Sequence, residues 1–414
     1  MLLPVTLLCA AQFVIVLDVT IVAVALPDIR ASLGMSPASL QWVLTAYTLT
    51  FGGLLIAAGR LGDLVGRRRL FCAGLATFGA ASLACALAPS APALVAARAV
   101  QGVGAAMEAP SALALVTATA TDRRRAVSWW TAAAAGGGAS GWVLGGLLVQ
   151  AFGWPAVFLV NVPLCMAGTL LALRVVPESR GAPRALDLPG TVTVTAGLAL
   201  LVLGLAQVPA VLPAAATVLA LFVLVERRAP DPILPGWTLR RPGFARANGV
   251  ALALTATTTG AMFLAMLYQQ EELGRSALEA GLWSAPLNLA VIAGSMLSPR
   301  AAMPAGLASI AAGAGLLVTL APAALVSAFV LMGLGLGCAS VASTASGTAA
   351  LPDGEQGIAS GVLNAAAQIG SALGLAAIAP LGYRAGFLAV VVVALAAATR
   401  SCRPCRRRPT TPRP

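Results

Sequence analysis

Three ionisable side chains lie inside long apolar stretches of this 414-residue sequence. Asp18 lies in a run from about residue 5 to 27, and Arg98 and Glu108 share a run from about 93 to 117. If these runs cross a bilayer, an ionised group at the centre costs about 2.5–3.5 kcal/mol, so such residues usually serve a function. A buried carboxyl group can take up and release a proton, and we predict this chemistry for Asp18 and Glu108.

Each of these residues also has a purely structural alternative. Asp18 could form a hydrogen bond with Thr20 or with a neighbouring helix, and Arg98 could extend toward the outer lipid headgroups. Glu108 could be a neutral acid held by hydrogen bonds. It follows Arg98 by ten residues, so the two side chains would share a helix face about 15 Å apart. The sequence leaves both interpretations open for all three residues.

The composition is that of a membrane protein. Hydrophobic residues make up 59% of the chain, charged residues only 10%, and the mean hydropathy is +0.91. Soluble domains have about a quarter of their residues charged, so the solvent of this chain must be lipid. We predict an all-α polytopic membrane protein with about fourteen transmembrane helices. The apolar runs fall near 5–27, 40–58, 70–88, 93–117, 127–150, 156–175, 190–207, 209–226, 245–268, 280–298, 304–320, 322–345, 357–380 and 384–399.

The net charge of +12 comes from arginines in the connections between apolar runs. All 26 basic residues are arginine, and 22 of them fall on one side if the N-terminus is inside. Arg30, Arg275 and Arg384 fall on the other side. This bias predicts a multi-pass protein of the inner (plasma) membrane with both termini cytoplasmic, and it argues against a nucleic-acid partner.

The sequence offers little for catalysis or metal binding. It contains no histidine, and Cys402 and Cys405 in the basic tail are too few ligands for zinc. We therefore expect no metal, no cofactor and no enzymatic activity.

The connection between the second and third runs carries a dense motif. It reads Gly-Arg-Leu-Gly-Asp-Leu-Val-Gly-Arg-Arg-Arg over 59–69. Asp63 can pair with Arg67 one turn later, and an acid near a helix N-terminus is favoured by the helix dipole. Such a cluster could hold two helix ends together in one conformation and release them in another. The alternative is an ordinary basic loop. The residues expected to form the switch are Gly59, Asp63, Gly66, Arg67 and Arg68.

The spacing of this motif resembles the signature loop of the major facilitator superfamily. Segments 17–27, 98–106 and 357–370 resemble the fourteen-helix drug:proton antiporter family within it. The resemblance implies two six-helix bundles plus two inserted helices. It also implies a secondary active transporter that exports small lipophilic compounds, cations included, in exchange for protons by alternating access. An exporter of a specific metabolite, such as an amino acid or sugar, is the alternative.

The expected domains follow from the same resemblance. Residues 1–178 would form the N-terminal bundle, 179–243 the linkers and inserted helices, 244–399 the C-terminal bundle, and 400–414 a basic cytoplasmic tail. The expected partners are a small-molecule substrate, protons and lipid, and we expect a monomer.

The resemblance also implies roles for single residues. Asp18 and Arg98 would couple protons to transport, whereas Glu108 stands where the family usually has an apolar residue, and we add it as a second protonation site. Gly137, Gly141, Gly145 and Gly146 resemble the helix-packing antiporter motif, although Trp142 replaces its proline. The short connection over 299–304 departs from the family's longer basic loop. The residues expected to line the substrate cavity are Gln41, Thr45, Tyr47, Gln101, Asn288, Asn364 and Gln368.

Overall fold

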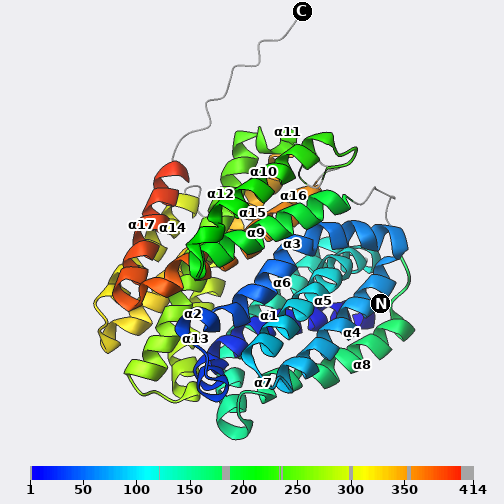
Figure 1. Cartoon of the computed structure of the whole chain (residues 1–414). Helices are drawn as coiled ribbons and strands as arrows, with labels where there is room; N and C mark the ends of the chain where they lie inside the picture. Colours follow the sequence, from blue (N-terminus) through cyan, green and yellow to red (C-terminus); the bar gives the residue numbers. More distant parts are fainter. Residues whose placement is uncertain are drawn as a thin grey trace, which may run out of the picture.

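The computed structural model describes residues 2–120, 122–179, 187–232, 234, 236–297, 302–351 and 356–401. Within these ranges every regular element is helical, and there is no strand. Figure 1 shows two groups of long helices, with the inserted pair α9 and α10 lying over one side. The predicted all-α fold is confirmed.

The first group contains six long helices and two short ones. Its long helices alternate in direction through short connections, which is how consecutive apolar runs pack in a bundle. They are α1 (Leu2–Leu33), α3 (Trp42–Val65), α4 (Arg67–Ala86), α5 (Ala91–Thr119), α6 (Arg123–Phe152) and α8 (Asn161–Val175), with the short helices α2 (Pro37–Leu40) and α7 (Ala156–Leu159).

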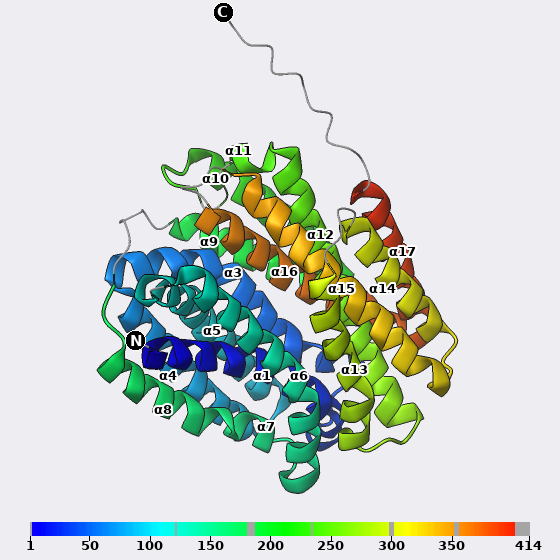
Figure 2. The ribbon, with the colours of Figure 1, turned by 180° about the vertical axis from the view of Figure 1, so that it is seen from behind.

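The second group repeats this plan. Its first helix ends in a π-helical turn at Tyr268–Glu272, and a short helix α11 (Gly236–Leu239) precedes it. The long helices are α12 (Pro242–Leu267), α13 (Ala277–Met296), α14 (Ala302–Val318), α15 (Leu325–Ala349), α16 (Gln356–Ile378) and α17 (Tyr383–Ser401). Seen from behind in Figure 2, α1 to α8 and α12 to α17 form two separate bodies that meet along one side.

Thirteen described helices are long and apolar enough to span a membrane. The remaining apolar helix of the fourteen expected is α14, whose 17 residues begin next to undescribed residues. The short connection over 299–304 lies partly outside the described residues. Of the predicted tail over 400–414, only Arg400 and Ser401 are described. Cys402 and Cys405 lie outside the described residues.

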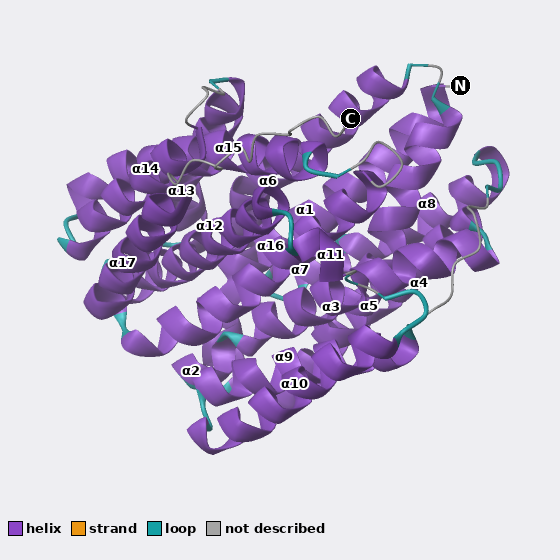
Figure 3. Cartoon of the chain, turned by 90° about the horizontal axis from the view of Figure 1, so that it is seen from above, coloured by secondary structure: helices purple, strands orange, loops and turns teal. Residues whose placement is uncertain are grey.

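The inserted helices lie outside both bundles (Figure 3). Helix α9 (Leu188–Ala206) packs on α3 and on α16, so it covers the seam between the bundles on that side. Val202 packs there with Trp42 of α3 and with Ala372 and Ala376 of α16. Helix α10 (Leu212–Arg228) packs mainly on α9 and leaves Leu221 and Leu224 exposed, as expected of a lipid-facing helix.

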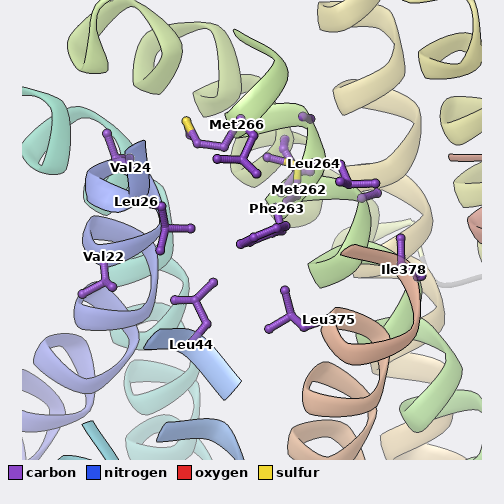
Figure 4. Close-up of a cluster of buried hydrophobic side chains, with 14 of the residues drawn as sticks. Val22, Val24, Leu26, Leu44, Met262, Phe263, Leu264, Met266, Leu375 and Ile378 are labelled. Atoms are coloured by element: carbon purple, nitrogen blue, oxygen red, sulfur yellow. The ribbon is translucent and has the colours of Figure 1, made fainter. Parts of the chain in front are cut away.

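The two bundles meet along α3 and α16 and along α6 and α13, and we call the end of this contact that carries Leu26, Leu44, Phe263 and Leu375 the latch face. Apolar side chains of α1 and α3, including Leu26 and Leu44, lie opposite Phe263 of α12 and Leu375 of α16 (Figure 4). Helix α6 packs on α13, and α3 packs on α16. The arginine distribution predicts that the latch face is extracellular. The conformation is therefore closed at the end that the sequence places outside.

Candidate functional site

A buried ion pair lies in the centre of the first bundle. Nη1 of Arg98 on α5 donates to Oδ2 of Asp18 on α1 at 2.6 Å, and neither side chain is exposed to solvent. Thr20 does not contribute, since its hydroxyl donates to the carbonyl oxygens of Val16 and Leu17. The guanidinium of Arg98 turns inward rather than toward lipid headgroups. Arg98 thus does not extend to the headgroups as its structural alternative required, and Asp18 is hydrogen-bonded to neighbouring helices, as its own structural alternative predicted.

Side-chain amides complete the site around Asp18. Oδ1 of Asp18 accepts hydrogen bonds from Nε2 of Gln101 at 2.9 Å and from Nδ2 of Asn161 at 2.8 Å. Gln101 also accepts from Arg98 at 2.6 Å and donates to Oγ of Ser82 at 2.9 Å. Three donors, one of them the guanidinium of Arg98, thus satisfy the buried carboxylate of Asp18.

Sequence reasoning missed two members of this site. Asn161 and Ser82 are both fully buried, and neither was expected there. A single polar amide at the start of an apolar run was the available signal for Asn161. Gln101 was expected in the substrate cavity, and it instead forms part of the fully buried Asp18 site.

Aromatic rings and one backbone carbonyl hold Arg98 from the remaining directions. Its Cζ atom lies 4.4 Å from the ring centroid of Tyr47 and 5.8 Å from that of Phe158. Its Nε donates to the carbonyl oxygen of Val43 at 2.8 Å. The ring of Tyr47, expected to line the cavity, is fully buried against this guanidinium. A guanidinium donates in several directions at once, which explains why arginine and not lysine suits this position.

Glu108 lies on the same helix as Arg98 in a different environment. Its side chain is fully buried, and neither carboxyl oxygen has a hydrogen-bond partner. The neighbouring helix approaches closely, since a Cβ atom on Gly74 would lie 2.7 Å from the backbone nitrogen of Glu108. Asp18 and Glu108 are therefore not one paired site within the described residues.

The signature loop between α3 and α4 closes on the end of α8. Asp63 and Arg67 form the expected pair, with Nη2 of Arg67 2.7 Å from Oδ1 of Asp63. Gly66 has φ of 112°, and a Cβ atom there would lie 2.9 Å from the Glu178 carboxyl group. Oε1 of Glu178 accepts from the backbone nitrogen of Arg68 at 3.0 Å. Glu178, which the sequence did not predict, therefore caps the N-terminus of α4.

The glycines of α6 form two close contacts. Gly137, Gly141 and Gly145 face α1, where a Cβ on Gly145 would lie 3.0 Å from the Cα of Ile21. Gly146 instead faces Ala277 and Leu278, at the start of α13 in the other bundle. Helix α6 continues without a break from Arg123 to Phe152, as expected where Trp142 replaces a proline.

Of the other residues predicted to line a cavity, some are buried inside the first bundle and others lie where the two bundles meet. Gln41, the N-cap residue of α3, and Thr45 within α3 are buried, and their polar side-chain atoms have no hydrogen-bond partner. Asn288 of α13 donates to the carbonyl oxygen of Gly138 in α6 at 2.8 Å. Gln368 of α16 lies against Gly52 of α3, and Asn364 is exposed one turn earlier.

Polar contacts between the bundles cluster at the latch face. Nη1 of Arg30, at the end of α1, lies 2.5 Å from Oε1 of Glu271 in the π-helical turn. Nε2 of Gln270 donates to the carbonyl oxygen of Val24 at 3.0 Å. The π-helical turn thus directs two consecutive side chains across to the other bundle.

Comparison with known proteins identifies the family. The sequence model of the Major Facilitator Superfamily matches residues 8–375. The chain is 38% identical to the "Cephamycin export protein CmcT" of Amycolatopsis lactamdurans, over 89% of this chain and 82% of that protein. It is 38% identical to the "Puromycin resistance protein pur8" of Streptomyces alboniger, over 89% of this chain and 79% of that protein.

Solved structures agree on the fold. A peptide transporter of the POT family, solved with sulfate, superposes with a TM-score of 0.73 at 15% identity, covering 96% of this chain and 92% of that one. A second POT transporter gives 0.70 at 14% identity, covering 95% and 94%. The chain therefore belongs to the major facilitator superfamily, and it is a multi-pass membrane transporter and not an enzyme.

Proposed function

We propose that this transporter exports small lipophilic compounds, antibiotics among them, in exchange for protons by alternating access. The observation that carries the proposal is the fully buried pair of Asp18 and Arg98 in a chain whose relatives are export and resistance proteins. A transporter that only let solutes diffuse would have no need of an ion pair that is costly to bury.

Asp18 is the group that binds the transported proton in this proposal. Protonation neutralises its charge, so Arg98 loses its ionic partner while it remains in a water-free interior. Removing one partner of a buried ion pair costs about 3–5 kcal/mol. That cost favours a second conformation in which water or another group reaches Arg98. Proton binding and conformational change are thereby linked.

The signature loop is the switch at the opposite end from the latch face. Asp63 with Arg67, and Glu178 with the α4 N-terminus, tie α3, α4 and α8 into one unit. Residues 1–178 would rock as this unit against 244–399, with 179–243 linking them. Gly137, Gly141 and Gly145 of α6 pack closely on the part of α1 that carries Asp18. A movement of α1 would therefore move α6 with it.

The membrane orientation completes the proposal. The transporter would lie in the inner (plasma) membrane with both termini cytoplasmic, so the latch face opens outward. Substrate would leave there as protons enter. Gln41 and Thr45 are the candidates to meet substrate when the latch opens, because their buried polar atoms lack partners. Asn288, Asn364 and Gln368 would line the seams of the second bundle.

Growth inhibition tests the proposed substrate class. The chain is expressed in a drug-sensitive host and challenged with puromycin, lincomycin, a cephamycin and unrelated lipophilic cations. We expect raised resistance to at least one antibiotic, lost in Asp18→Asn. No resistance across the panel, with normal amounts of protein in the membrane, would instead favour an exporter of a specific metabolite.

A further inference from the structure

Two carboxyl groups of the first bundle have opposite surroundings. Asp18 receives hydrogen bonds from Arg98, Gln101 and Asn161. Glu108 is equally buried, yet neither of its carboxyl oxygens receives a hydrogen bond. No arginine forms an ion pair with it among the described residues. Because the carboxyl group of Asp18 receives hydrogen bonds and that of Glu108 receives none, we expect the two groups to differ in protonation.

The space around Glu108 is apolar and tightly packed. Helices α4, α5 and α8 form one apolar cluster here, to which Phe78, Ala105, Ala109 and Cys165 belong. The close approach of Gly74 leaves α4 no room to supply a longer polar side chain at this level. An ionised carboxylate without a donor would cost far more than a neutral acid in such a place.

We infer that Glu108 carries a proton in this conformation and is a second proton-binding site of the transporter, distinct from Asp18. The inference rests on the proposed proton-coupled export. In each cycle Glu108 takes up a proton when its surroundings are open to water on the outside. It releases the proton when they are open to water on the cytoplasmic side. A cycle therefore moves one proton more than Asp18 alone would carry.

Tyr47 lies against Arg98 of the Asp18 site and belongs to the same apolar cluster as Phe78, Ala105 and Ala109. Its ring stacks on the guanidinium of Arg98, and its buried hydroxyl has no hydrogen-bond partner. The other titratable groups packed in this interior, among the described residues, are Cys9 of α1, Cys72 and Cys85 of α4 and Cys165 of α8.

Among the described residues, neither the hydroxyl of Tyr47 nor the carboxyl group of Glu108 has a hydrogen-bond partner in this closed conformation. The proton on Glu108 is therefore held until the helices move. Pro110, two residues later, has no backbone N–H, so the carbonyl group of Ala106 lacks its helical donor and α5 can bend there.

The number of protons moved per substrate tests this inference. Wild-type protein and Glu108→Gln are reconstituted in liposomes, and the membrane potential at which net transport reverses is measured at a fixed pH gradient. We expect the proton-to-substrate ratio to fall by one in Glu108→Gln and to stay unchanged in Glu272→Gln, which removes an exposed acid. An unchanged ratio in Glu108→Gln would overturn the inference.

Infrared spectroscopy gives a readout that does not depend on transport. Wild-type protein in lipid should show the carbonyl stretch of a neutral carboxylic acid, and Glu108→Gln should lack that band, whereas Glu272→Gln retains it. Absence of the band in wild-type protein would also overturn the inference. Wild-type protein that transports without any proton dependence would refute the proposed function, while the infrared band would still report on Glu108.

Discussion

The guanidinium of Arg98 and the carboxylate of Asp18 lie 2.6 Å apart in the core of the first bundle, although 80 residues separate them in sequence. Each is fully buried, and each forms a further hydrogen bond with another helix. A buried pair held in this way is stable only while both charges are present. Neutralising Asp18 therefore affects five helices at once, because α1, α3, α4, α5 and α8 all contribute to the site.

Arg98→Lys should abolish uphill efflux and lower the melting temperature in detergent. Lysine keeps the positive charge, but its ammonium cannot reproduce the fork that reaches Asp18, Gln101 and the carbonyl of Val43 together. Thermal unfolding and efflux assays on the same preparations would measure both effects. Arg384→Lys, an exposed position, serves as the matched control and should behave like wild type. Wild-type efflux in Arg98→Lys would mean that charge alone is sufficient.

Glu271→Gln should make the latch face open more often. It removes the ion pair with Arg30, whose two side chains are 33% and 28% exposed. Partly exposed pairs contribute about 0.2–1 kcal/mol, so the open fraction should rise by up to about fivefold. Leu44→Cys, placed in a background without other cysteines, would report this as faster labelling by an impermeant maleimide. Glu272→Gln should leave the labelling rate unchanged, and an equal rate in Glu271→Gln would show that the latch does not depend on this pair.

Gly281→Val should prevent the bundles from closing at the latch face. A Cβ atom at Gly281 would clash with the backbone carbonyl of Trp142 in α6, and backbone cannot turn aside as a side chain can. We expect loss of transport together with faster labelling of Leu44→Cys. Gly315→Val is the matched control, because a Cβ atom there meets nothing within 4 Å. Normal transport by Gly281→Val would refute a role for α6–α13 contact in the cycle.

Local features of the structure could be predicted from the sequence, and long-range pairings could not. The pair of Asp63 and Arg67 follows from their separation of four residues on successive helical turns. The apolar runs predicted the helices within a few residues, because a bilayer demands about 20 apolar residues for each crossing. The inserted pair of helices was also predicted from its flanking linkers.

Contacts between distant helices depend on packing that one sequence does not reveal. Asp18 and Arg98 were each expected to be functional, but their direct contact requires α1 and α5 to be neighbours. Asn161 was missed because an amide near a helix start is common and carries no charge. Glu178 was missed because its role depends on α8 ending beside Gly66, whose lack of a Cβ atom leaves room for the carboxyl group.

Proton-driven transport by wild-type protein and by Asp18→Asn in liposomes is the most direct test of the proposed export. The liposome interior is made acidic, so that protons flowing out can drive uptake, and accumulation of an antibiotic to which the chain confers resistance is followed. Asp28→Asn, an exposed acid on the same helix, is the control. We expect uphill transport by wild type and Asp28→Asn, and only downhill exchange by Asp18→Asn. Uphill transport by Asp18→Asn at the wild-type rate would contradict the role of the buried pair in proton coupling.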